Sequence, residues 1–281
     1  MGKKDRRNRL NEAGRPERTI YNGSQAQDRT TFDELIRHFD REKPLLKYPD
    51  QLILEIGKFF LGTPYVAGSL ETKAAEHLIV NLREFDCVTF AENMVALVRL
   101  VRSRQKSFEA FQKFLQKIRY RQGRLQGYSS RLHYFSDWIH DNQKKGIVRD
   151  VTAEIGGRPF KKTVTFMTTH PDLYPPLKDP ANLRRMKSLE RTISKRPLFF
   201  IPRKTLRRSE DQLRDGDLIA ITTNKEGLDV QHVGFAARVR NRIHLLHASN
   251  VTGKVVLFED TLYRYLMQSK TRSGIMVARV L

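Results

Sequence analysis

The sequence contains one cysteine, Cys87, among 281 residues, so an internal disulfide is excluded. It has no window close to the roughly 18 consecutive apolar residues that a membrane-spanning helix needs, because arginine interrupts the longest apolar runs. The polar start has no apolar segment after its basic residues, so a secretory signal is not predicted. A chain complete in this form is expected in the cytoplasm, whereas removal of an earlier leader would place it outside.

Acidic residues are few relative to basic ones. The 31 Asp plus Glu stand against 52 Lys plus Arg, which gives a formal charge of +21 and favours contact with anionic partners such as envelope polymers. The basic residues are scattered, and the sequence lacks zinc-finger spacing and RNP-like signatures. We therefore predict nonspecific anionic contacts and no dedicated nucleic-acid partner.

Metal-binding patterns are also sparse. The sequence has no HExxH motif and no second cysteine, so neither a metal nor another cofactor is predicted. His133, Asp137 and His140 do recur at helical spacing on one face of a predicted helix. This arrangement leaves zinc-dependent hydrolysis open as an alternative.

The same helix offers a second interpretation. His133, Tyr134, Ser136 and Trp138 are predicted to shape the wall of a binding site, because such sites combine aromatic surface with a few polar groups. His170 lies in a proline-rich loop that could close over the substrate, and it is a comparable candidate.

Hydrophobic periodicity divides the chain into a helical part and a strand-rich part. Residues 1–30 have no such periodicity and are predicted to form a flexible basic arm. Helical spacing starts near Thr31, and short β-rich runs follow from about Leu198. Helices followed by an antiparallel sheet indicate an α+β fold. We expect one domain over 31–281, with a largely helical insertion at 103–195 that contributes to the substrate cleft.

The cysteine stands at the start of a predicted buried helix. Asp86 is predicted as the N-cap, and Cys87 then occupies the first turn. Free N–H groups and the positive helix end stabilise a thiolate or an oxyanion at this position. A nucleophilic Cys87 would also need a group that takes its proton, and histidine is the usual choice.

A predicted hairpin near the C-terminus carries that histidine. On one face of its first strand lie His232 and Gly234, and the cysteine-bearing helix is expected to approach this face. An even-numbered turn at Arg240 and Asn241 would place His247 opposite Gly234 and within reach of His232. His232 is then a candidate base, and His247 is a candidate orienting residue.

Five motifs follow one another along the chain: "GTPYVAG", "DC", "DGDLIAI", "HVGFA" and "LLHAS". Together they resemble the NlpC-type papain-like cell-wall hydrolases of bacteria. The resemblance implies a papain-like core in which the cysteine helix packs on a small antiparallel sheet. It further implies a Cys-His-His triad that cuts amide bonds in peptidoglycan. Cys87 matches the nucleophile of that triad, His232 the base and His247 the orienting residue.

A narrower resemblance covers nearly the whole chain from about Phe32. The motifs "LGTPYVAGSLE", "NLREFDCVTFAEN", "RLHYFSDWI", "THPDLYPPL" and "DVQHVGFA" resemble the N-acetylmuramoyl-L-alanine amidase-like branch of that superfamily. This implies hydrolysis of the amide between N-acetylmuramic acid and L-alanine, in the periplasm or cell envelope. It also makes Tyr65, Asp86 and Gln231 candidates for substrate contact. The resemblance further implies that the predicted wall of His133, Tyr134, Ser136 and Trp138 binds a sugar.

Two other functions are also compatible with the sequence. A stem-peptide endopeptidase of the same superfamily would use the same triad on a different bond. A non-catalytic binder would use the positive charge to hold an anionic polymer.

Overall fold

The structure is a computed structural model that describes residues 15–41, 48–71 and 75–281, with side chains described for 25–40, 48–71 and 75–281. The helices of these residues are α2 (Arg15–Arg41), α3 (Pro49–Phe59), α4 (Cys87–Arg102), α5 (Phe108–Arg119), α6 (Phe135–Lys144), α7 (Phe166–Thr169), α8 (Pro180–Ser194), α9 (Leu206–Ser209) and α10 (Leu262–Met267). Five short 3-10 helices are η1 (Arg121–Gly123), η2 (Tyr128–Ser130), η3 (Pro171–Leu173), η4 (Pro175–Lys178) and η5 (Glu210–Gln212). No helix within the described ranges is long and apolar enough to cross a membrane.

The strands form one antiparallel sheet in the order β2-β3-β8-β4-β5-β6-β7, with β1 paired to β8. Their bounds are β1 (Val148–Asp150), β2 (Arg158–Pro159), β3 (Phe199–Pro202), β4 (Leu218–Thr223), β5 (Val230–Val239), β6 (Arg242–Ser249), β7 (Lys254–Leu257) and β8 (Arg272–Val280). The predicted α+β class is confirmed. The expected insertion at 103–195 is helical for the most part, but β1 and β2 join it to the sheet.

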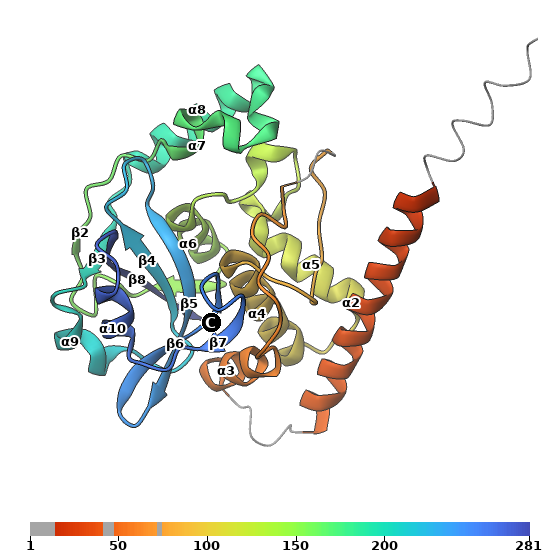
Figure 1. Cartoon of the computed structure of the whole chain (residues 1–281), viewed down its shortest axis with the longest axis horizontal. Helices are drawn as coiled ribbons and strands as arrows, with labels where there is room; N and C mark the ends of the chain where they lie inside the picture. Colours follow the sequence, from red (N-terminus) through yellow and green to blue (C-terminus); the bar gives the residue numbers. More distant parts are fainter. Residues whose placement is uncertain (1–14, 42–47, 72–74) are drawn as a thin grey trace, which may run out of the picture.

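Helices cover both faces of the sheet (Figure 1). On one face, α3, α4 and α5 share an apolar core with residues such as Leu218, Val233 and Phe235. On the other face, α9 and α10 pack against Ile219, Ile221 and other residues of the same strands. A strand buried on both faces is apolar at nearly every position, as β4 is.

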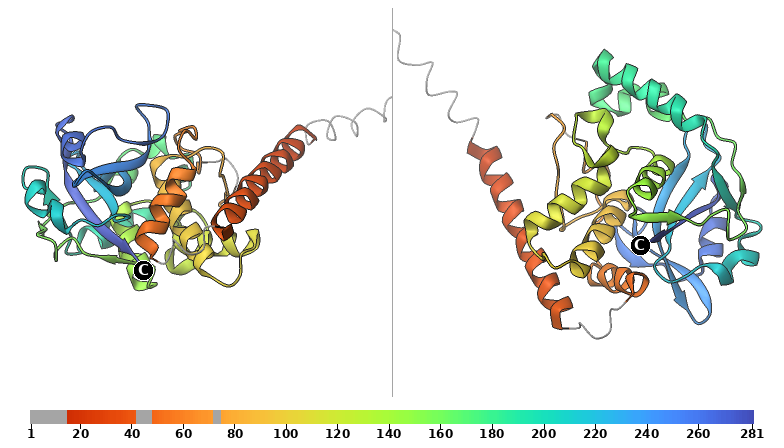
Figure 2. Two further views of the ribbon diagram at one scale, coloured as in Figure 1. Left: turned by 90° about the horizontal axis from the view of Figure 1, so that it is seen from below. Right: turned by 180° about the vertical axis from the view of Figure 1, so that it is seen from behind.

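The N-terminal helix begins earlier than expected. Helix α2 starts at Arg15, so residues 15–30 are helical rather than an arm without regular structure, while residues 1–14 lie outside the described part. Arg, Glu, Gln and Ala favour a helix even without apolar spacing, which explains the difference. Phe32 of its second half packs against Phe108 and Phe111 of α5. The two views of Figure 2 show the first half extending away from the sheet and the other helices.

Candidate active site

Helix α4 presents Cys87 at its first position. Asp86 is the N-cap: its carboxylate accepts the N–H of Thr89 at 2.7 Å, and the Thr89 hydroxyl accepts the N–H of Asp86 at 2.9 Å. This capping box fixes the first turn. The N–H groups of Thr89 and Phe90 are bonded to Asp86, whereas those of Cys87 and Val88 point at the sulfur.

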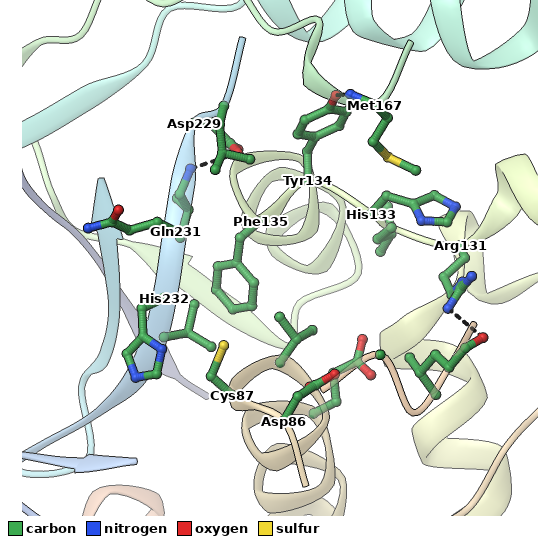
Figure 3. Close-up of a pocket in the computed structure, with 18 of the residues that line it drawn as sticks. Asp86, Cys87, Arg131, His133, Tyr134, Phe135, Met167, Asp229, Gln231 and His232 are labelled. Atoms are coloured by element: carbon green, nitrogen blue, oxygen red, sulfur yellow. Dashed lines mark hydrogen bonds between the residues drawn. The ribbon is translucent and has the colours of Figure 1, made fainter. Parts of the chain in front are cut away.

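The sulfur lies in a pocket of about 200 Å³ between α4, β5 and the segment 131–135 (Figure 3). Figure 3 shows the thiol directed into this pocket beside His232, with Asp229 and Arg131 farther along its walls. The backbone N–H of Val233 also faces the sulfur. Cys87 and His232 thus line one pocket.

The two histidines meet in the predicted way. The turn between β5 and β6 consists of Arg240 and Asn241, both at positive φ, and the register pairs Phe235 with Leu246. Nε2 of His232 lies 2.6 Å from Nδ1 of His247, and both side chains are buried. The hydrogen bond leaves Nδ1 of His232 as the ring nitrogen available to the thiol or to a substrate.

The approach of the helix differs from the prediction. Helix α4 packs on the face of β5 that carries Val233 and Phe235. The ring centroids of Phe90 and Phe235 lie 6.0 Å apart. His232 belongs to the opposite face, where its ring lies 6.1 Å from that of Tyr265 in α10. β5 pairs with β6 only from Phe235 onward, and Gln231, His232 and Val233 before that point line the pocket together with Cys87.

Burial decides the protonation states of Cys87 and His232. It raises the pKa of the Cys87 thiol to about 12, and the Asp86 carboxylate adds to this shift. The N–H groups at the sulfur act in the opposite direction but do not outweigh burial, so the expected thiolate gives way to a protonated thiol at rest. Burial also holds the pKa of His232 well below its usual range, with a further contribution from His247. The resting pair is therefore a thiol and a neutral imidazole. The described side chains of Cys87 and His232 form no direct hydrogen bond with each other. Catalytic hydrogen bonds often tighten only when substrate binds.

The predicted substrate-contact residues divide into two groups. Asp86, His133, Tyr134 and Gln231 line the pocket with the cysteine. Tyr65 is not among the lining residues, but burial raises the pKa of its hydroxyl to about 12, and Cys87, when ionised, and Asp86 act on it in the same direction.

The other predicted contacts lie elsewhere. Trp138 does not reach the pocket, because it is fully buried in the core, stacks on Phe135 and donates its Nε1–H to Glu92 at 3.2 Å. Ser136 is buried and does not line the pocket either. His170 is exposed and stacks on Phe166, away from the pocket lining.

The pocket also contains polar groups that the sequence analysis missed. Asp229 is 1% exposed, accepts the N–H groups of Ser136 and Val230, and has a pKa raised by burial. Arg131 is 5% exposed and pairs with Glu71 at 2.8 Å. Asp229 opens the motif "DVQHVGFA" and Arg131 opens "RLHYFSDWI", so both motifs held a signal.

The proposed metal face is occupied by protein partners. Asp137 forms ion pairs with Arg121 at 2.6 Å and with Arg196 at 2.5 Å, so the negative charge of its carboxylate is already balanced by two guanidinium groups. Among the described residues, no group of three or more His, Cys, Asp or Glu side chains is arranged to hold a metal ion.

Gly234 provides a test of the histidine arrangement. A Cβ at this position would lie 2.8 Å from both the Cβ of His247 and the carbonyl oxygen of Leu246. Because the backbone cannot yield cheaply, we expect Gly234→Ala to cost about 1–3 kcal/mol of stability and to displace the His247 ring. Thermal unfolding and the His232–His247 coupling in NMR spectra would measure both effects; an unchanged melting temperature and unchanged ring signals would contradict the prediction.

Comparisons with known proteins now give the site a context. Residues 55–275 match the family model described as N-acetylmuramoyl-L-alanine amidase-like (AmiA-like). The comparison with curated proteins gives no match. The crystal structure of an N-acetylmuramoyl-L-alanine amidase from Bacteroides uniformis is 37% identical, with a TM-score of 0.79 over 83% of this chain and 99% of that chain.

Two further solved structures are similar. A Bacteroides fragilis protein, named provisionally as a xylanase, is 40% identical with a TM-score of 0.75 over 80% of this chain and 99% of that chain. A Legionella pneumophila protein is 24% identical with a TM-score of 0.67 over 92% of this chain and 96% of that chain, which shows a shared fold. From the extent of the family match, the chain belongs to the N-acetylmuramoyl-L-alanine amidase-like family.

Proposed function

We propose that the protein is a cysteine amidase that hydrolyses the amide between N-acetylmuramic acid and L-alanine in peptidoglycan fragments. The observation that carries this proposal is the pocket in which Cys87 and His232 lie together, with His232 held by His247 at 2.6 Å. A nucleophile, a base and an orienting group are the parts that thiol-based acyl transfer requires.

In the first step, the thiol of Cys87 attacks the lactyl carbonyl carbon while Nδ1 of His232 takes its proton. The carbonyl oxygen becomes an oxyanion, for which the N–H groups of Cys87 and Val88 are the candidate donors. Collapse of this intermediate breaks the C–N bond, and His232 passes the proton to the leaving amine of L-alanine. The products of this step are a muramoyl thioester and a free peptide.

In the second step, water replaces the peptide. His232 removes a proton from the water, whose oxygen attacks the thioester carbon, and the C–S bond then breaks. The proton returns to the sulfur and restores the thiol. Because His232 must accept a proton twice in each cycle, the neutral resting imidazole suits this role.

The surrounding residues supply the proposed substrate contacts. Asp86, His133, Tyr134 and Gln231 line the pocket, and Tyr65 lies near the sulfur. We propose them as contacts for the sugar and the first peptide residues. Arg131 adds a cationic side chain to the same pocket.

We also propose an NlpC-type papain-like core formed by residues 31–281. It is supported by a cysteine at the start of α4, which packs on an antiparallel sheet whose strand β5 bears the histidine. The peptidoglycan substrate makes the cell envelope the proposed place of action, where the net charge of +21 favours contact with anionic polymers.

Incubation with a muramoyl-tripeptide tests the bond that is cut. We expect a new L-alanine amino terminus and free muramic acid derivative, identified by mass spectrometry. Cleavage within the stem peptide would assign the endopeptidase activity instead. If no muropeptide is cut, while binding to anionic polymer weakens steeply with salt and is the same in Cys87→Ala, the protein is a binder.

A further inference from the structure

His247 has a buried ring nitrogen whose proton needs an explanation. Its Nε2 is buried and has no hydrogen-bond partner among the described residues, although the side chain is only 1% exposed. If Nδ1 of His232 must accept the thiol proton, then Nε2 of His232 carries the hydrogen and donates it to Nδ1 of His247. The proton of a neutral His247 is therefore on the partnerless Nε2.

An aromatic ring lies against this histidine. The ring centroid of Tyr265 in α10 is 5.3 Å from that of His247, with an angle of 76° between the planes. Such an edge-to-face arrangement allows an N–H group to rest on a π face, which is a weak acceptor. Tyr265 is 4% exposed, and Phe258 packs on it at 4.9 Å, so the ring is held in place.

A guanidinium group lies on the tyrosine ring. The Cζ atom of Arg272, at the start of β8, is 3.7 Å from the centroid of Tyr265, and its NH1 group donates to the Tyr265 carbonyl oxygen. The groups that act on His247 thus come from three elements: His232 from β5, Tyr265 from α10 and Arg272 from β8. The thiol of Cys87 in α4 acts on Tyr265. The only fixed charge in this set is positive.

We propose that Tyr265 and Arg272 are positioning residues for the histidine pair: the tyrosine ring fixes the proton of His247 on Nε2, and the guanidinium holds that ring and adds a positive charge that opposes protonation of both buried imidazoles. The inference rests on the proposed role of His232 as the base. It assigns a function to α10 and to the start of β8, neither of which touches the reacting atoms. The histidine pair would then always present the same free nitrogen, Nδ1 of His232, to the thiol.

Electrostatics agree with this arrangement. Burial first, and then the charge of Arg272, lower the pKa of His247 to about 4, and Arg272 also contributes to the lowered pKa of His232. Removal of the positive charge raises both values. The acid limb of the activity profile then moves to higher pH.

The test is an NMR titration of the histidine rings in the full chain, with signals assigned by His232→Gln and His247→Gln. In the wild type we expect both rings to stay neutral, with hydrogen on Nε2, throughout the mildly acidic range. In Arg272→Gln we expect both midpoints to rise by about one pH unit, whereas Arg272→Lys, which retains the charge, shifts them less. Unchanged midpoints in a folded Arg272→Gln protein would overturn the role of the guanidinium.

A second pair of variants tests the ring. Tyr265→Phe retains the π face and is expected to keep the wild-type tautomer and kcat. Tyr265→Leu is expected to yield a mixture of His247 tautomers and a kcat lowered about tenfold at unchanged KM. An unmixed tautomer in a folded Tyr265→Leu protein would refute the inference. Because the titration needs no substrate, a failure of the proposed amidase activity would be recognised separately.

Discussion

Replacement of Cys87 by alanine is expected to lower kcat for muropeptide hydrolysis about 10⁴-fold or more, because the covalent route through the thioester is lost. Hydrogen-bond donors and the pocket remain, so a small residual rate is expected. The chain has no other cysteine that could replace the nucleophile. Steady-state kinetics on a purified muramoyl-peptide measure the effect.

The controls separate a chemical role from a structural one. Cys87→Ser retains the size and hydrogen bonding of the side chain, and it is expected to unfold at the wild-type temperature while losing nearly all activity. Iodoacetamide should inactivate the wild type in proportion to one alkylated cysteine, and a chelator should have no effect. Retention of more than about a tenth of kcat in Cys87→Ala would reject the cysteine mechanism, and sensitivity to the chelator would favour zinc hydrolysis.

The histidine pair could be predicted because its geometry depends on local sequence. Strand alternation and a two-residue turn are sufficient to set the register of a hairpin. Arg240 and Asn241 form that turn, and the resulting register places His247 opposite Gly234, where the glycine leaves space for the ring. A one-residue change of turn length would have separated the histidines.

The side of the sheet on which α4 packs could not be predicted in the same way. β5 is buried on both faces, so alternation between apolar and polar residues carries no information about which face meets the helix. The approach of α4 to the face of His232, which the catalytic interpretation predicts, is therefore wrong, and the helix packs against Val233 and Phe235. Tyr265 was missed for a related reason, since a six-residue helix is too short to show a period.

Trp138 illustrates how burial can reverse an interpretation. Its neighbours Ser136, Asp137 and Asp141 make α6 look like a polar surface helix, but all three are buried and hydrogen-bonded or ion-paired through backbone or side chain. The indole N–H instead donates a hydrogen bond to the buried carboxylate of Glu92. Sequence alone cannot reveal such a partner, because it lies 46 residues away.

Substitution of Glu92 is expected to lower the stability of the fold strongly. Glu92 accepts Nε–H of Arg119 at 2.6 Å and Nε1–H of Trp138 at 3.2 Å, and both charged side chains are 2% exposed. Glu92→Ala would leave the guanidinium buried without its counter-charge. We expect a loss of about 3–5 kcal/mol in the free energy of unfolding, measured by urea denaturation. This is a large share of the 5–15 kcal/mol that is typical of a folded domain.

A matched double variant separates the cost of an unpaired charge from the net value of the ion pair. In Glu92→Leu/Arg119→Met both charges are removed and replaced by apolar side chains, so the desolvation penalty disappears together with the attraction. We expect this variant to be more stable than Glu92→Ala and to lose only about 1–3 kcal/mol relative to the wild type, because the Trp138 N–H loses its acceptor. If the double variant were as unstable as Glu92→Ala, the loss would stem from packing around the tryptophan, and the buried charge would not be its cause.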